Sequence, residues 1–120
     1  MLSHVLEHLA SPRDVLERCR ELVAPGGAIF VEVPNVLAPR VESAVDFFTF
    51  DHLFNFCPAT LGPLLRACGF EPVARQTDFP FPAFRMLAVA CAPAVAALDA
   101  PSRAVGEIRR CVRAYADARD

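Results

Sequence analysis

The chain has 120 residues, 54% of them hydrophobic and 22% charged, which fits one folded domain and excludes a disordered segment. Twelve arginines and no lysine stand against fourteen acidic residues, and the formal net charge of −2 argues against a general nucleic-acid binder, which needs a basic surface. The longest apolar run, residues 86–98, contains Pro93 and is too short to span a bilayer. We therefore expect no nucleic-acid partner and no membrane span.

The cysteines give an expectation about the compartment. There are five, an odd number, and no two of them form a C-x-x-C pair of the kind used in zinc or redox sites. We expect buried free thiols in a reducing environment, and hence a cytoplasmic protein. Residues 1–14 also lack the basic start and apolar core of a signal peptide.

The first third of the chain predicts a helix between two strands. Residues 2–3 fit the end of a strand. Residues 12–23 carry apolar side chains on one stripe and charged ones opposite, with Ser11 placed as the N-cap of this helix. The Pro-Gly-Gly segment at 25–27 ends the helix. Residues 28–33 are apolar at nearly every position, which predicts a strand buried on both faces of its sheet.

Two later strands are predicted to pair antiparallel, because residues 77–83 between them leave no room for a crossover helix. The second of these strands is also apolar enough to be buried on both faces. In the helix before them, Pro63 predicts a kink or a later start, since proline removes a helical hydrogen bond. The elements expected here are a short helix over 41–48, a loop over 51–56, a helix over 58–68, strands over 70–76 and 84–91, and a helix over 102–118.

Polar residues follow both of the first two predicted strands. Ligands of open α/β sheets bind outside the carboxyl ends of parallel strands. Residues 3–8 follow the first strand and residues 32–35 end the second, so the two segments share one edge if the strands lie side by side. His52 lies on the loop that must return past this edge.

The segment from His4 to His8 concentrates two histidines and a carboxylate. On a helix, His4, Glu7 and His8 share one face and could converge on a divalent metal, with His52 as a fourth ligand. Glu7 and His8 could instead only cap and orient the following loop, or contact a substrate and act as a base. The five residues also match H-x-x-E-H, an inverted zinc-protease motif, but this short match would need a further ligand and a large substrate cavity.

Three other features allow two interpretations each. Glu32, the only charge in its predicted strand, could face a substrate or pair with a nearby arginine such as Arg85. Asn35 follows Pro34 and could lie beside a substrate, but it is more typical of a turn. The phenylalanines of residues 47–56 are more typical of a core than of an aromatic substrate pocket.

The run HVLEHLASPRDVLERCRELVAPGGAIFVEVPN strongly resembles the second half of a class I S-adenosylmethionine-dependent methyltransferase. In that family a strand ends in a "vlEHl" turn, an amphipathic helix ends in "L.PGG", and a buried strand ends in "PN". The resemblance covers roughly residues 1–91. It continues in order through Asp51-His52-Leu53, Phe56, Thr60-Leu61, Leu64-Leu65 and Gly69-Phe70.

The resemblance implies an α/β fold: an incomplete Rossmann-like sheet covered by helices, with residues 1–95 as the C-terminal half of a methyltransferase domain and 96–120 as a C-terminal helix. Its last strand would insert antiparallel between the two before it. The chain has no G-x-G segment, so the Gly-rich half that holds S-adenosylmethionine is missing. Only Ser3 and His4 would remain at the cofactor, and we expect the chain alone to be inactive.

The resemblance also implies roles for the polar residues. Some relatives carry E-x-x-E-H here and bind a divalent metal; Glu7 and His8 match this pattern, while His4 replaces the first glutamate. His8, His52 and Asn35 would be the catalytic residues, and a small molecule would receive the methyl group on oxygen, nitrogen or carbon. One alternative is a non-catalytic module that uses its open sheet edge to bind another chain, which would complete the sheet. Another is a truncated remnant of the methyltransferase fold.

Overall fold

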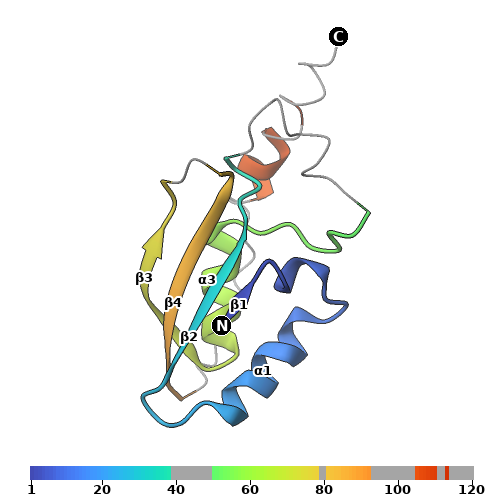
Figure 1. The fold of residues 1–120 in the computed structure, drawn as a ribbon. Helices are drawn as coiled ribbons and strands as arrows, with labels where there is room; N and C mark the ends of the chain where they lie inside the picture. Colours follow the sequence, from blue (N-terminus) through green and yellow to red (C-terminus); the bar gives the residue numbers. More distant parts are fainter. Residues whose placement is uncertain (39–49, 79–80, 93–104, 111–112, 114–120) are drawn as a thin grey trace.

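The computed structural model describes residues 1–38, 50–78, 81–92, 105–110 and 113 (Figure 1). These residues form a mixed sheet of four strands with helices packed on it, so the expected α/β class is confirmed. The elements in chain order are strand β1 (Leu2–Ser3), 3-10 helix η1 (Leu6–His8), helix α1 (Pro12–Leu22), strand β2 (Ala28–Pro34), helix α3 (Pro58–Ala67), strand β3 (Phe70–Gln76) and strand β4 (Ala83–Ala90).

The strands lie in the order β1-β2-β4-β3, as Figure 1 shows. β1 runs parallel to β2, with Leu2 opposite Val31 and Ser3 opposite Glu32. β4 runs antiparallel to both β2 and β3. The last strand is therefore inserted between the two before it, as the resemblance implied. The short β3–β4 connection explains why these two strands pair antiparallel.

Helix α1 forms where the amphipathic pattern predicted it. Pro12 occupies its first turn, and Leu16 is completely buried against the sheet. Arg13 and Glu17 form an ion pair with 2.8 Å between Nε and Oε1 on the exposed side. Gly26 follows the helix in a left-handed conformation, with φ of 74°, which glycine adopts without strain and which reverses the chain into β2.

Helix α3 begins at Pro58, so of the two outcomes expected from Pro63, a kink or a later start, the later start is excluded. Its first turn is stabilised locally, because the Cys57 backbone N–H donates to Thr60 Oγ1 at 3.0 Å. Pro63 lies in the helix, and the carbonyl that it leaves without a helical donor belongs to Ala59. Both residues are exposed, so water can satisfy that carbonyl.

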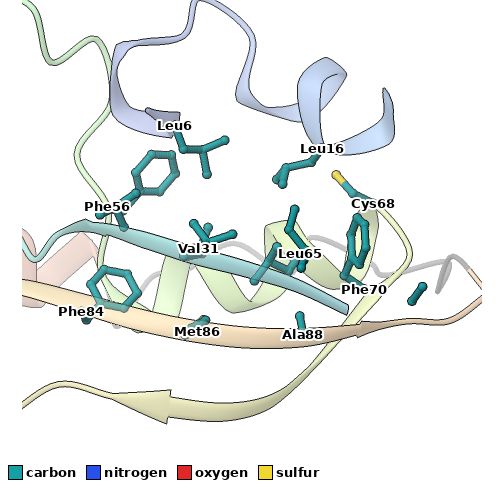
Figure 2. Packing of buried hydrophobic residues seen from close by; sticks show 14 residues of the cluster. Leu6, Leu16, Val31, Phe56, Leu65, Cys68, Phe70, Phe84, Met86 and Ala88 are labelled. Atoms are coloured by element: carbon teal, nitrogen blue, oxygen red, sulfur yellow. The ribbon is translucent and has the colours of Figure 1, made fainter. Parts of the chain in front are cut away.

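The core lies between one face of the sheet and the helices. Figure 2 shows Leu6, Leu16 and Leu65 directed toward β2 on the same side as Val31. Alternation along the strands places the inward side chains of β2 and β4 on one face. The buried core comprises Leu6, Leu16, Ile29, Val31, Val33, Phe56, Leu61, Leu65, Cys68, Phe70, Phe84, Met86, Ala88 and Ala90.

The prediction that β2 and β4 are buried on both faces is wrong. Phe30 and Glu32 of β2, and Arg85 and Val89 of β4, are only half-buried, and Leu87 is exposed. These residues point away from the core, on the face opposite α1 and α3. Within the described part of the chain both long helices pack on the same face, so the other face, which we call the open face, stays accessible.

Several expectations concern the remaining segments. The helix expected over 41–48 lies outside the described residues. Residues 105–110 are helical, as expected within 102–118, and Ile108 packs against a small second cluster around Val36 and Cys57. The loop expected over 51–56 is present. Its Phe56 is buried, but Phe50 and Phe54 are exposed, and Phe47 and Phe48 lie outside the described residues. Among the phenylalanines that the structure describes, the interpretation as core therefore holds only for Phe56.

Two further observations concern the expected free thiols and the expected lack of a membrane span. The four cysteines that the structure describes, at positions 19, 57, 68 and 91, are free thiols, and Cys57 and Cys68 are buried. Burial raises the pKa of the Cys68 thiol to about 11, since a thiolate there would lose its hydration. None of the helices in the described ranges has the length and apolarity needed to cross a bilayer.

Candidate functional site

The polar residues expected at one edge of the sheet do meet there. β1 and β2 run parallel, so their carboxyl ends lie together, and the His4 backbone N–H donates to the Glu32 carbonyl at 2.9 Å. The group that forms there, which we call the rim, consists of Ser3, His4, Glu7, His8, Glu32 and His52.

Glu32 anchors the rim on the open face. Its carboxylate accepts hydrogen bonds from the Ser3 hydroxyl at 2.8 Å and from Arg85 of β4. The expected pair of Glu32 with Arg85 is thus confirmed. The pKa of the Glu32 carboxyl lies below its ordinary value of 4.5, chiefly because Arg85 hydrogen-bonds to it, with Ser3 adding to the effect.

His4 adopts a left-handed backbone conformation, with φ of 51°, which is rare for a residue with a side chain. This turn directs the imidazole between two carboxylates, with Nε2 3.4 Å from Glu32 Oε1 and Nδ1 3.4 Å from Glu7 Oε1. The ring also meets Phe81 edge-on, with 5.8 Å between the centroids. Conformations of this kind often occur at functional sites, where surrounding contacts hold them in place.

His4 is therefore not part of a helix with Glu7 and His8, and that expectation is wrong. The helix there is the single turn η1, which starts at Leu6. The H-x-x-E-H motif needs both histidines on one helical face, so its zinc-protease geometry is not formed.

Glu7 is a buried carboxylate in an unusual state. Its side chain is 1% exposed, and neither oxygen has a hydrogen-bond partner among the residues that the structure describes. Two imidazole nitrogens face this carboxylate, with His4 Nδ1 at 3.4 Å and His8 Nε2 at 3.8 Å from Oε1. Burying a carboxylate without donors costs several kilocalories per mole, and a cation held beside Glu7 would offset that cost.

The His8 ring has a defined hydrogen-bonding direction. Its Nδ1 lies 2.8 Å from the backbone carbonyl oxygen of Asp51. A carbonyl can only accept, so Nδ1 carries the hydrogen and donates it. In the neutral ring Nε2 then holds a lone pair, and this is the nitrogen that faces Glu7. Two hydrogen-bond acceptors, His8 Nε2 and Glu7 Oε1, therefore face each other at 3.8 Å.

His52 completes this group. Its ring lies edge-on to that of His8, with 4.9 Å between the centroids. One ligand atom from each of Glu7, His8 and His52 lies within 4.8 Å of the others. One carboxylate and two imidazoles suit Zn²⁺, Mn²⁺ or Fe²⁺ better than Mg²⁺, which prefers oxygen ligands.

The loop that carries His52 is fastened to η1 at two points. The Phe54 backbone N–H donates to the Glu7 carbonyl at 3.1 Å, and Asp51 holds His8 as described. The backbone of the loop, and not only its side chains, therefore positions the histidines.

Asn35 has a different place. It is buried at the end of β2, where its side-chain Oδ1 accepts the Leu37 backbone N–H at 3.2 Å and its own N–H donates to the Pro82 carbonyl. The turn-forming interpretation is confirmed, and the carboxamide oxygen is already engaged in that turn.

Two contributors to the site were not predicted from the sequence. Asp51 acts through its backbone carbonyl. Every residue has such a carbonyl, so the residue type at this position does not indicate the role. Phe81 contacts His4 from the β3–β4 loop. It lies between two prolines, which restrict the backbone on both sides of it, so the sequence does indicate a held aromatic residue at this position.

Comparisons with known proteins agree with this description. The family model described as a methyltransferase domain matches residues 1–75. A solved protein classed as a methyltransferase, in complex with the Haloferax volcanii Trm112 methyltransferase activator, shares the fold with a TM-score of 0.57 at 14% identity. The match covers 74% of this chain and 52% of that one, so the present chain spans about half the length of that protein. No curated protein matches significantly.

The substitution Glu32→Gln tests whether the Glu32 carboxylate, which we call the anchor, stabilises the fold. A depressed folded-state pKa means that the carboxylate stabilises the fold at neutral pH and that this contribution disappears as the pH falls through the folded-state value. We expect Glu32→Gln to lower the unfolding free energy by about 1–2 kcal/mol near pH 7, from lost charged hydrogen bonds, and by much less near pH 3. Denaturant unfolding at both pH values measures this.

Glu17→Gln is the matched control, because it removes an ion pair that is exposed on α1. It should cost less than Glu32→Gln near neutral pH. Equal losses for the two variants, or a Glu32→Gln loss that does not change with pH, would contradict the anchor.

Proposed function

The chain belongs to the methyltransferase domain family, and we propose on this basis that it supplies the C-terminal part of an S-adenosylmethionine-dependent methyltransferase acting on a small molecule. The observation that carries the proposal is the rim itself. Strained, buried and charged groups gather at the carboxyl ends of two parallel strands, where open α/β sheets bind their ligands.

Ser3 and His4 form the proposed cofactor side. The Ser3 hydroxyl is held by Glu32, and the His4 backbone is fixed by the Glu32 carbonyl, so this wall is rigid before any ligand arrives. The residues that the structure describes form a single wall, however, and a ligand against it would keep most of its surface in water. Affinity for the cofactor should therefore be weak unless further chain encloses it.

Glu7 and His8 form the proposed acceptor side. S-adenosylmethionine, when bound, supplies the methyl group, which passes to the acceptor as the carbon–sulfur bond breaks with both electrons kept by sulfur. The His8 Nε2 lone pair takes up the proton that the acceptor loses, and Glu7 stabilises the resulting imidazolium from 3.8 Å. Asp51 keeps the ring oriented, and Asn35 contributes indirectly by holding the turn after β2.

A divalent metal is the second candidate for this position. The orphaned Glu7 carboxylate and the lone pair of His8 Nε2 fit a shared cation, and His52 is close enough to join them. Such a cation would orient and acidify a hydroxyl of the acceptor. His4, which contacts Glu7 from the other side, is not a member of this group of three.

The open face and the edge of β1 support a further proposal about assembly. Phe30, Leu87 and Val89 leave apolar surface on the open face, and β1 ends the described sheet. We propose that additional protein, from this or another chain, completes the sheet and encloses the cofactor. The free thiols support a cytoplasmic location for this assembly.

Titration of the 15N-labelled chain with S-adenosylhomocysteine tests the cofactor side. We expect amide shifts confined to Ser3, His4 and their neighbours, with a dissociation constant in the millimolar range because the described residues provide only one wall. Amides of Leu22 and Val73, far from the rim, serve as internal controls. Shifts elsewhere, no shifts at the rim, or a micromolar dissociation constant would each contradict the proposal.

Calorimetry with Zn²⁺, Mn²⁺ and Mg²⁺ tests the metal. The donor set predicts one site that prefers Zn²⁺ or Mn²⁺ to Mg²⁺, and a loss of about tenfold or more in affinity on His52→Ala. His4→Ala is the matched control, since it removes an imidazole that touches Glu7 but lies outside the group, and it should change affinity little. Absence of stoichiometric binding would exclude the metal.

A further inference from the structure

A groove lies between α3 and β3, at the edge of the described sheet opposite to β1. We propose that it binds an extended segment of a partner protein in which an acidic residue lies between apolar residues. The proposal goes beyond the proposed function, because the rim is built on β1 and β2 and shares no residue with this groove. Three observations carry it: an apolar lining, an arginine without an ion-pair partner, and two residues that weaken the helix beside the groove.

The lining of the groove is mostly apolar. Gly62 and Pro63 of α3 contribute to one side, Pro72 and Val73 of β3 contribute to the other, and Met86 of β4 also lines the space. Val73 is 57% exposed, which is unusual for a valine in a strand. The space measures about 530 Å³, a size that suits several small side chains of a bound segment. Apolar surface that is left open in this way is typical of interaction sites.

The charge of the groove is positive, although the whole chain has a net charge of −2. Two arginines line it, and no acidic residue does so among the residues that the structure describes. Arg66 is already engaged, because its Nε donates to both oxygens of Glu71 at 3.0 and 3.1 Å. Arg75 forms no ion pair with any residue of the described ranges. The groove is therefore complementary to an apolar segment that carries a carboxylate.

The two residues least suited to the interior of a helix both face this groove. A Cβ on Gly62 would meet, apart from its own helix backbone, only Arg66 Nη1 at 3.8 Å, so packing within the chain does not require glycine there. Pro63 has no N–H to donate to the carbonyl of Ala59, which also lines the groove. A backbone N–H of the bound segment can donate to that carbonyl. Local choices that weaken an element without a packing reason are typical of functional sites.

The edge of β3 determines how the segment is held. Pro72 lacks an N–H, and the register with β4 shifts between Pro72 and Ala74, so a partner strand cannot pair regularly along this edge. The apolar side chains and the carboxylate of the segment must therefore supply most of the binding. A nucleic acid fits less well, since it requires a row of cations and aromatic rings for its bases, and no described aromatic residue lines the groove.

The test is a chemical-shift titration of the whole 15N-labelled chain with the peptides acetyl-Ala-X-Asp-X-Ala-amide, in which X is leucine, valine or proline. The blocked ends leave the aspartate as the only charge. We expect at least one of these peptides to shift the amides of Gly62, Val73 and Arg75. Replacing its aspartate by asparagine should weaken binding about threefold or more, through loss of an ion pair at a partly exposed site.

Arg75→Gln should weaken binding of the aspartate peptide by the same factor and leave binding of the asparagine peptide unchanged. Arg18→Gln is the matched control, because it removes an equal charge from an exposed arginine of α1 that pairs with Glu21. It should change the affinity for neither peptide.

Gly62→Leu tests the groove itself. Its side chain would occupy the space, and we expect the affinity for both peptides to fall about tenfold or more through lost apolar contact. Val73→Asp is a second variant at an exposed position, so the test does not depend on the folding of Gly62→Leu. The added negative charge should weaken the aspartate peptide more than the asparagine peptide.

Each opposite result overturns the proposal. Equal affinity for the aspartate and asparagine peptides would overturn the acidic class, and shifts confined to the rim or the open face would overturn the location. Absence of binding by all three aspartate peptides at millimolar concentration would exclude the segment, and so would equal shifts with sodium acetate alone, which would leave only a non-specific anion site. S-adenosylhomocysteine binding is measured at Ser3 and His4, so failure here leaves the methyltransferase proposal unchanged.

Discussion

The candidate site depends on one physical constraint: a buried carboxylate at Glu7 that finds no hydrogen-bond donor among the described residues and is faced by imidazoles on two sides. Burying such a group is unfavourable, because the charge loses its hydration and gains no hydrogen bonds in exchange. Two backbone contacts from the loop that carries His52 hold the residues around this carboxylate in place. The Phe54 backbone N–H binds the Glu7 carbonyl, and the Asp51 carbonyl fixes the His8 ring so that its second nitrogen points at the carboxylate.

The sheet explains why these groups meet. Parallel pairing of β1 and β2 brings Ser3 opposite Glu32, and the antiparallel insertion of β4 brings Arg85 opposite Glu32 from the other side. The resulting anchor lies on the open face, whereas the core lies on the opposite face under α1 and α3. The helices cover the core face, whereas the open face carries the Glu32 contacts and stays accessible in the part of the chain that the structure describes.

Much of the fold could be predicted, because its signals are local. The amphipathic stripe of α1, the Pro-Gly-Gly turn and the short β3–β4 loop each leave few alternatives. Burial was harder to predict. Phe30 and Leu87 are residue types typical of a core, but both described long helices pack on the opposite face of the sheet, so these two side chains are not covered. The left-handed His4 depends on its contacts with Glu32, and the tether through Asp51 uses a backbone atom, so neither produced a pattern in the residue types.

The central claim concerns where the protons lie on His8, and a long-range 1H–15N spectrum of its ring nitrogens tests it directly. The account predicts that, in the metal-free protein near pH 8, Nδ1 carries the hydrogen shared with Asp51 and Nε2 is unprotonated and faces Glu7. A spectrum in which Nδ1 lacks its hydrogen, or in which Nε2 carries one, would contradict the account.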